Sequence, residues 1–181
     1  MTTERILSFS SVVIAICAVC VSLWQGMVTR EHNRLSLKPY LVSAPELPGV
    51  GGQNGIFLSN HGGGPAFINN IEITANGKTF DLTKNSWSDL YQHLGIKSLC
   101  HYESYIPKGS ALKSGQKVKL LAPTNNPIDP NCPVQFIELL TAPELDLFVE
   151  YQSVYEDTYI YSQRIGLGAE DSILFKKLFG F

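Results

Sequence analysis

The most unusual local sequence in the chain is the run His61-Gly62-Gly63-Gly64-Pro65. Consecutive glycines allow positive φ angles and let backbone N–H groups approach an anion, so this run could hold a phosphate. It lacks the Gly-Lys-Ser/Thr ending of a P-loop, and residues 66–73 that follow have the composition of a strand, not of a helix. The alternative is a bulged turn between two strands, with Asn60 hydrogen-bonded to the backbone.

A second candidate site consists of four lysines within twelve residues: Lys108, Lys113, Lys117 and Lys119. A small anionic signal could bind either through the His61–Gly64 run or through this cluster, at Lys108, Lys113 and Lys117. The alternative is a solvated turn and an edge strand that lysines protect from further pairing. From residue 35 onward the chain has 11 Lys and Arg against 14 Asp and Glu. This acidic balance argues against a nucleic-acid polymer as partner.

Cysteine and histidine provide a third group of candidate residues. Cys100, His101 and Cys132, with His61 or His93, offer the ligand atoms that zinc prefers. Their spacing is unlike that of a metal site, since none of them form a Cys-x-x-Cys pair and adjacent residues of an extended segment point to opposite faces. We therefore predict no metal and no cofactor. Cys100 and Cys132 could instead form a disulfide, which would require an oxidising compartment.

Signatures of catalysis are missing from the sequence. There is no Gly-x-Ser-x-Gly motif, and the acidic pair Glu156-Asp157 lies in a predicted hairpin turn, where carboxylates are usually only solvated. We predict that the protein is not an enzyme.

The N-terminal segment decides the class of protein. Residues 6–29 carry no formal charge, and a helix rising ~1.5 Å per residue over this length crosses the ~30 Å hydrocarbon core of a bilayer. The main alternative is a cleaved signal peptide, whose apolar part is usually only ~7–15 residues long. We predict a transmembrane helix that stays attached.

Small and polar residues form one stripe along this predicted helix, at alternating steps of three and four residues. The stripe consists of Ser8, Ser11, Ala15, Ala18, Ser22, Gln25 and Thr29. Small side chains let a second helix approach closely, and Ser22 and Gln25 can hydrogen-bond across the contact for ~0.6–2 kcal/mol each. We therefore expect a homo-oligomer. The alternative is an accidental spacing, because Ser and Ala are common in membrane helices.

Flanking charges predict the orientation of the helix, because Lys and Arg resist transfer across a bilayer. Arg5 precedes the helix, whereas Arg30, Arg34 and Lys38 follow it. This bias places the main domain in the cytoplasm, at a bacterial inner membrane. The expected segments are a tail at 1–5, the transmembrane helix at 6–29, a juxtamembrane linker at 30–38, a β-sandwich domain at 39–168 and an apolar, basic tail at 169–181.

Strand signals dominate the domain after the helix. Seven short runs are rich in β-branched and aromatic residues and are separated by Gly, Pro or Asn clusters: residues 40–43, 55–59, 66–74, 78–82, 117–121, 145–151 and 158–163. Asn76-Gly77 predicts a tight hairpin turn, and residues 155–157 predict a second hairpin. Capping and proline signals predict two short helices, at 85–96 and from Pro133 to before Pro143. The predicted fold is mainly β, an antiparallel sandwich with one or two short helices.

Two stretches carry a resemblance. Residues 30–39 (REHNRLSLKP) and 58–68 (LSNHGGGPAFI) are similar to motifs of a widespread group of uncharacterised bacterial single-pass membrane proteins, and residues 150–155 extend the likeness. The departure from the family pattern is at Gly63. The resemblance implies an immunoglobulin-like sandwich beside the membrane and no activity that can be carried over.

These features predict a non-enzymatic, membrane-anchored interaction or scaffold module. It would self-associate through its helix and present the sandwich to an unidentified protein partner. The alternative is a ligand-gated membrane effector of a bacterial defence system, whose sandwich binds a small signal such as a nucleotide. At the C-terminus, large apolar residues surround Lys176 and Lys177, so this tail could lie on the bilayer surface or dock on its own domain.

Overall fold

The structure is a computed structural model, and it describes residues 3–46, 55–96, 100–124, 132–140 and 145–166. The chain divides into two compact units, Met1–Leu37 and Lys38–Phe181. The predicted C-terminal tail at 169–181 lies outside the described residues.

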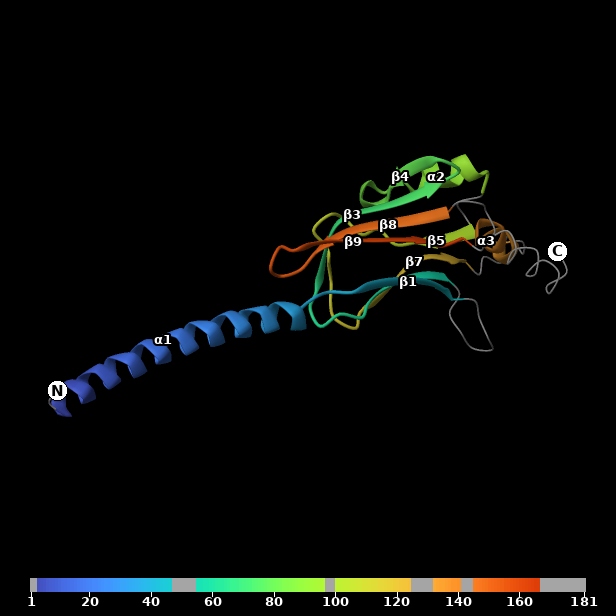
Figure 1. The fold of residues 1–181 in the computed structure, drawn as a ribbon. Helices are drawn as coiled ribbons and strands as arrows, with labels where there is room; N and C mark the ends of the chain where they lie inside the picture. Colours follow the sequence, from blue (N-terminus) through green and yellow to red (C-terminus); the bar gives the residue numbers. More distant parts are fainter. Residues whose placement is uncertain (1–2, 47–54, 97–99, 125–131, 141–144, 167–181) are drawn as a thin grey trace. The chain divides into compact units, whose positions relative to one another are not determined.

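The first unit is a single helix, α1 (Thr3–Ser36, 34 residues), drawn in blue in Figure 1. At ~1.5 Å per residue it is ~50 Å long, more than the ~30 Å of hydrocarbon in a bilayer. Within it, Ser8–Ser36 is long and apolar enough to span a membrane, with a mean hydropathy of 2.1 in its most apolar window. The helix continues through the predicted linker as far as Ser36, and Arg34 in its last turn complements the negative end of the helix dipole.

The second unit contains two antiparallel sheets. The first sheet has the order β1-β2-β7-β5, and the second has the order β4-β3-β8-β9 with β6 paired to β3 (Figure 1). The strands are β1 (Leu41–Glu46), β2 (Gly55–Asn60), β3 (Ala66–Ala75), β4 (Lys78–Asp81), β5 (His101–Glu103), β6 (Ala111–Leu112), β7 (Lys117–Pro123), β8 (Leu145–Gln152) and β9 (Thr158–Arg164).

All seven predicted strands are present, which confirms the mainly β fold with an N-terminal helix. Strands β5 and β6 have no counterpart among the predicted runs, because strands of three and two residues are too short to show alternation.

The core lies between the two sheets. In β8, Leu145, Leu147, Val149 and Tyr151 are buried and alternate with half-buried residues, the pattern of a strand with one face on the core. Leu41 and Leu58 of the first sheet belong to the same buried cluster. Each large apolar side chain removed from water in this way contributes ~1.5–3 kcal/mol before entropy is counted.

The turns and helices follow the sequence signals with one exception. Asn76 and Gly77 both have positive φ (50° and 76°), as a two-residue hairpin of the primed type requires. Gly95 ends helix α2 (Trp87–Leu94) in the left-handed conformation. The capping signal for this helix is the pattern Ser86-x-x-Asp89. Ser86 does stand at the N-cap of α2, but its side chain makes no capping hydrogen bond.

Two further helical segments complete the domain. A 3-10 turn, η1 (Leu82–Lys84), follows β4, and helix α3 (Cys132–Leu140) begins close to the predicted Pro133. Helix α2 packs near β4, and α3 packs near β7.

Candidate functional site

The predicted stripe lies on α1, where the side chains of Ser8, Ser11, Ala15, Ala18, Ser22 and Gln25 are all exposed. Two of its hydroxyls bond within the helix: Ser11 Oγ donates to the carbonyl of Ser8 and Ser22 Oγ to that of Ala18, each at 2.8 Å. Because these hydroxyls are already partnered, they can enter an apolar environment at little cost. The stripe is thus smooth and only weakly polar.

The loop after β2 is organised by the side chain of Asn60, which is 1% exposed. Its Oδ1 accepts hydrogen bonds from the N–H groups of Tyr40 (3.1 Å) and Gly62 (2.9 Å). Its Nδ2 donates to the carbonyls of Gly64 (2.8 Å) and Leu112 (3.0 Å). One amide therefore satisfies four backbone groups and joins the loop to β6 and to the start of the domain.

Glycine is required at position 62 because a side chain would have no room there, and not because of the backbone φ angle. A Cβ at this position would lie 2.3 Å from the carbonyl oxygen of Lys38 and 2.4 Å from the nitrogen of Tyr40. None of the three consecutive glycines is among the positive-φ residues, which differs from the expectation that they supply positive φ. The N–H of His61 donates to the carbonyl of Tyr40 at 2.7 Å.

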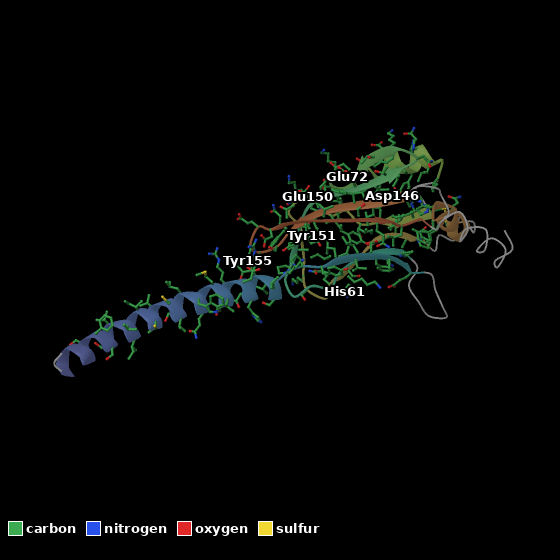
Figure 2. All side chains as sticks on the ribbon, viewed as in Figure 1. His61, Glu72, Asp146, Glu150, Tyr151 and Tyr155 are labelled. Carbon is green, nitrogen blue, oxygen red and sulfur yellow. A yellow bond between two sulfur atoms is a disulfide. The ribbon has the colours of Figure 1, made fainter. Side chains whose placement is uncertain are left out.

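This geometry favours the structural interpretation of the His61–Gly64 run. The N–H of Gly62, which an anion would need, already bonds to Asn60. His61 and Gly63 are exposed, whereas Gly64 is buried. Figure 2 shows His61 at one end of the domain, on the side of the β1–β2 sheet. Binding of an anion by this run stays a prediction.

The candidate lysines occupy different surfaces. Lys117 forms an ion pair with Glu46, and its Nζ lies 4.1 Å from the ring centroid of Phe57, on the outer face of the first sheet. Lys108 lines a cleft on the outer face of the second sheet. Lys113 precedes a turn in which Ser114 Oγ donates to the carbonyl of Gly62 at 2.6 Å. Ser114, the neighbour of Lys113, thus contacts the His61–Gly64 run, and the backbone of Lys117 pairs with Ser59, two residues before that run.

Sequence reasoning missed the cleft beside Lys108. It has a volume of about 580 Å³ and is lined by Asn69, Asn70, Glu72 and Glu150, among others. Figure 2 shows Glu72 and Glu150 on β3 and β8. The pairing of β3 with β8 shifts register between Ile68 and Asn70, so a β-bulge turns both asparagines outward. A signal was present in the sequence: Ile68 and Ile71 are three residues apart, so the alternation within residues 67–73 is broken, as at a bulge.

The polar groups of this cleft largely satisfy one another. Asn70 Nδ2 donates to Glu72 at 2.8 Å, and Asn69 Nδ2 donates to Glu150 at 3.3 Å. At the rim, the hydrogen bond from Lys84 lowers the pKa of Asp81. The cleft is therefore a polar surface whose amide and carboxylate groups are hydrogen-bonded to one another.

Cys100 and Cys132 form a disulfide, with Cα atoms 4.7 Å apart across 32 residues of sequence. Both cysteines are buried, at 0% and 1% exposure. Next to them His101 stacks on Tyr91 (ring centroids 5.2 Å apart) and lies 6.2 Å from the ring of Phe136. Because both thiols are bonded in the disulfide, neither is available as a zinc ligand. Within the described residues no group of three or more His, Cys, Asp or Glu side chains could hold a metal.

Together these features define a class of protein: an apolar N-terminal helix followed by a separate, mainly β domain of two antiparallel sheets. Comparison with protein-family models, with curated proteins and with solved structures found no match for the chain.

Proposed function

We propose that this protein is a membrane-anchored, non-enzymatic interaction module. In this proposal α1 holds the chain in a bilayer and associates with other copies, and the sandwich presents its surface to a protein partner. The observation that carries the proposal is the separation of the chain into an apolar helix, exposed from Ser8 to its last residue, and a domain that has its own buried core. An exposed apolar surface of this length needs lipid or another helix to cover it.

The small-residue stripe supports self-association. Ala15 and Ala18 stand between Ser11 and Ser22, whose hydroxyls bond to their own helix. Such a surface allows two backbones to come close, so that van der Waals contacts hold the helices together in lipid.

The disulfide supports a location on the oxidising side of the membrane. Disulfides persist outside the cytoplasm and are rare within it. The flanking charges favour the opposite orientation, but three basic residues against one is a small bias, and the N-terminal amine reduces it further. We give the disulfide more weight and propose that the N-terminal tail faces the cytoplasm while the sandwich lies on the far side of a bacterial inner membrane.

Association is tested by the double variant Ala15→Leu/Ala18→Leu in the full chain, with Val13→Leu/Ile16→Leu as the matched control on the opposite surface of the helix. We expect the first variant to lower the oligomer fraction, measured by analytical ultracentrifugation in detergent and by a membrane two-hybrid assay, and the control to leave it unchanged. If the Ala15→Leu/Ala18→Leu variant formed the same oligomer fraction as the unmodified protein, the stripe would not be the surface through which the helices associate.

Orientation is tested by thiol labelling of intact cells with a reagent that does not cross the membrane. The background for this test carries Cys17→Ala and Cys20→Ala, which removes the two free thiols of α1. In this background the chain should label only after reduction in denaturant, because Cys100 and Cys132 are bonded. Ser114→Cys in the same background, with Cys100→Ala and Cys132→Ala, should label directly from outside. Labelling of that cysteine only after lysis would place the domain in the cytoplasm.

A further inference from the structure

Several loops of the domain gather at the end where the chain enters it, at Lys38. The N–H of His61 donates to the carbonyl of Tyr40 at 2.7 Å. The Nζ of Lys38 lies 5.1 Å from the ring centroid of Tyr159, near the start of β9. The start of β1, the loop after β2 and the β8–β9 hairpin therefore share one end of the domain, which we call the entry end.

The tip of the β8–β9 hairpin projects outward from the entry end. Tyr159 pairs with Tyr151, and Val154 in the tip lies three residues further along the chain than Tyr151. At ~3.3 Å per residue the tip reaches ~10 Å beyond the backbone of this pair. Figure 2 shows Tyr155 at this end of the second sheet and Asp146 toward the opposite end.

The conformation of the tip is fixed by Ser153, which is buried. Its Oγ accepts hydrogen bonds from the N–H groups of Tyr155 (3.1 Å) and Asp157 (3.3 Å), and its own N–H donates to the carbonyl of Asp157 at 3.0 Å. Val154 and Tyr155 nevertheless stay 43% and 44% exposed, and Tyr40 at the same end is 61% exposed. A hydrogen-bonded turn thus presents apolar and aromatic side chains to the outside of the domain.

In a bilayer that α1 spans, the entry end would stand close to the lipid headgroups. A bilayer with its headgroups is ~40–45 Å thick and α1 is ~50 Å long, so the helix extends only ~5–10 Å beyond them. A single residue, Leu37, separates the end of α1 at Ser36 from Lys38. A hairpin tip that projects ~10 Å can cover this distance.

We propose that the entry end is a second membrane contact, in which Tyr40, Val154 and Tyr155 enter the headgroup region of the bilayer; this inference rests on the proposed anchoring by α1. Tyrosine suits this region, because its ring is apolar while its hydroxyl stays in contact with water. Glu156, next to Tyr155, is exposed. Because a carboxylate is costly in hydrocarbon, the contact stays at the depth of the headgroups. The partner is the surface of a phospholipid bilayer, which would limit how the domain tilts on its helix.

Depth-dependent fluorescence quenching tests this contact in the full chain, in nanodiscs of phosphatidylcholine. A single cysteine carries the fluorophore NBD in a background with Cys17→Ala and Cys20→Ala and with the buried disulfide intact. Val154→Cys reports on the hairpin tip, and Lys78→Cys, at the other end of β3, is the matched control. Nitroxide lipids place the quencher either on the headgroup or near the end of the acyl chain. We expect the headgroup nitroxide to quench the label at position 154 several times more than the acyl-chain nitroxide does, and neither to quench the label at position 78.

A third chain tests the anchoring separately. It keeps Cys17, in the middle of the uncharged run, and carries Cys20→Ala. The acyl-chain nitroxide should quench the label on Cys17 most strongly. If it does so while the label at position 154 behaves like the label at position 78, the second contact is overturned and the anchoring stands. A label on Cys17 that no lipid nitroxide quenches would overturn both.

The aromatic side chains are tested by Tyr40→Ser/Tyr155→Ser in the chain with Val154→Cys. Loss of two interfacial rings should roughly halve the headgroup quenching at position 154. Tyr102→Ser/Tyr105→Ser removes two similarly exposed tyrosines on and after β5, and it should leave this quenching unchanged. Unchanged quenching in Tyr40→Ser/Tyr155→Ser would overturn the assignment of the contact to these side chains.

Discussion

The hydroxyl of Tyr161 on β9 accepts a hydrogen bond of 2.7 Å from the backbone N–H of Ser43 on β1. Strands β9 and β1 are the edges of different sheets, so this bond joins the two layers along one side of the sandwich. The same hydroxyl lies 3.3 Å from the carbonyl of Ser43 and within reach of Gln163. An edge N–H that would otherwise be open to another strand is therefore satisfied by a side chain.

Tyr161→Phe removes this link and keeps the ring. We expect the free energy of unfolding to fall by about 1 kcal/mol, the net value of one hydrogen bond, because the N–H of Ser43 loses its partner. Urea unfolding of the full chain in nanodiscs, followed by the fluorescence of buried Trp87, measures the change. Tyr155→Phe, on the exposed hairpin tip, is the control and should stay within ~0.5 kcal/mol of the unmodified protein. Equal stability of both variants would contradict a stabilising role for the bond.

Alkaline pH should destabilise the domain. Burial raises the pKa of Tyr91, and it also raises the pKa values of Tyr151 and Tyr161. In the unfolded chain these phenols ionise near pH ~10, whereas in the folded domain they ionise only at higher pH. The stability that depends on them is therefore complete below pH ~10 and is lost as pH rises further.

Urea midpoints measured at pH 8, 9.5 and 10.5 test this dependence. Tyr91→Phe should reduce the fall of the urea midpoint between pH 9.5 and pH 10.5, because Tyr91 is the most deeply buried of the three phenols. If the urea midpoint of Tyr91→Phe fell with pH as steeply as that of the unmodified protein, the loss of stability would come from other groups, such as the lysines.

Gly62→Ala should destabilise the domain by ~2–4 kcal/mol, because the added Cβ would overlap backbone atoms of residues 38–40 that cannot move without breaking the bonds around Asn60. Gly63→Ala is the matched control, since Gly63 is exposed and has no positive φ. Thermal unfolding followed by circular dichroism compares the two variants. If Gly63→Ala were the more damaging substitution, the packing argument for Gly62 would fail.

Loss of the disulfide should lower stability by ~3–4 kcal/mol, the loop-closure entropy for a cross-link that spans 32 residues. Urea unfolding of the Cys100→Ala/Cys132→Ala variant and of the unmodified chain measures this difference in the free energy of unfolding. Because both sulfurs are buried, mild reductant without denaturant should leave the native disulfide intact. Rapid reduction of the folded protein would show that this end of the domain opens readily.

The amino-acid sequence by itself determined the features that depend on neighbouring residues. An uncharged run of 24 residues indicated the long apolar helix, and the Asn76-Gly77 pair predicted its hairpin because both residues adopt positive φ easily. Runs of β-branched and aromatic residues between Gly, Pro or Asn clusters located the seven longer strands. These signals are local, so they can be read without the fold.

Tertiary structure alone decided which distant residues meet. It bonded Cys100 to Cys132, a disulfide that the sequence allowed but did not establish. It separated Lys108 from Lys117 by placing them on the outer faces of different sheets, although they are close in sequence. It also opened a pocket between β6 and β7. Each of these results depends on which strands pair and how the two sheets pack, and contacts between residues far apart in the chain leave no periodic pattern in the sequence.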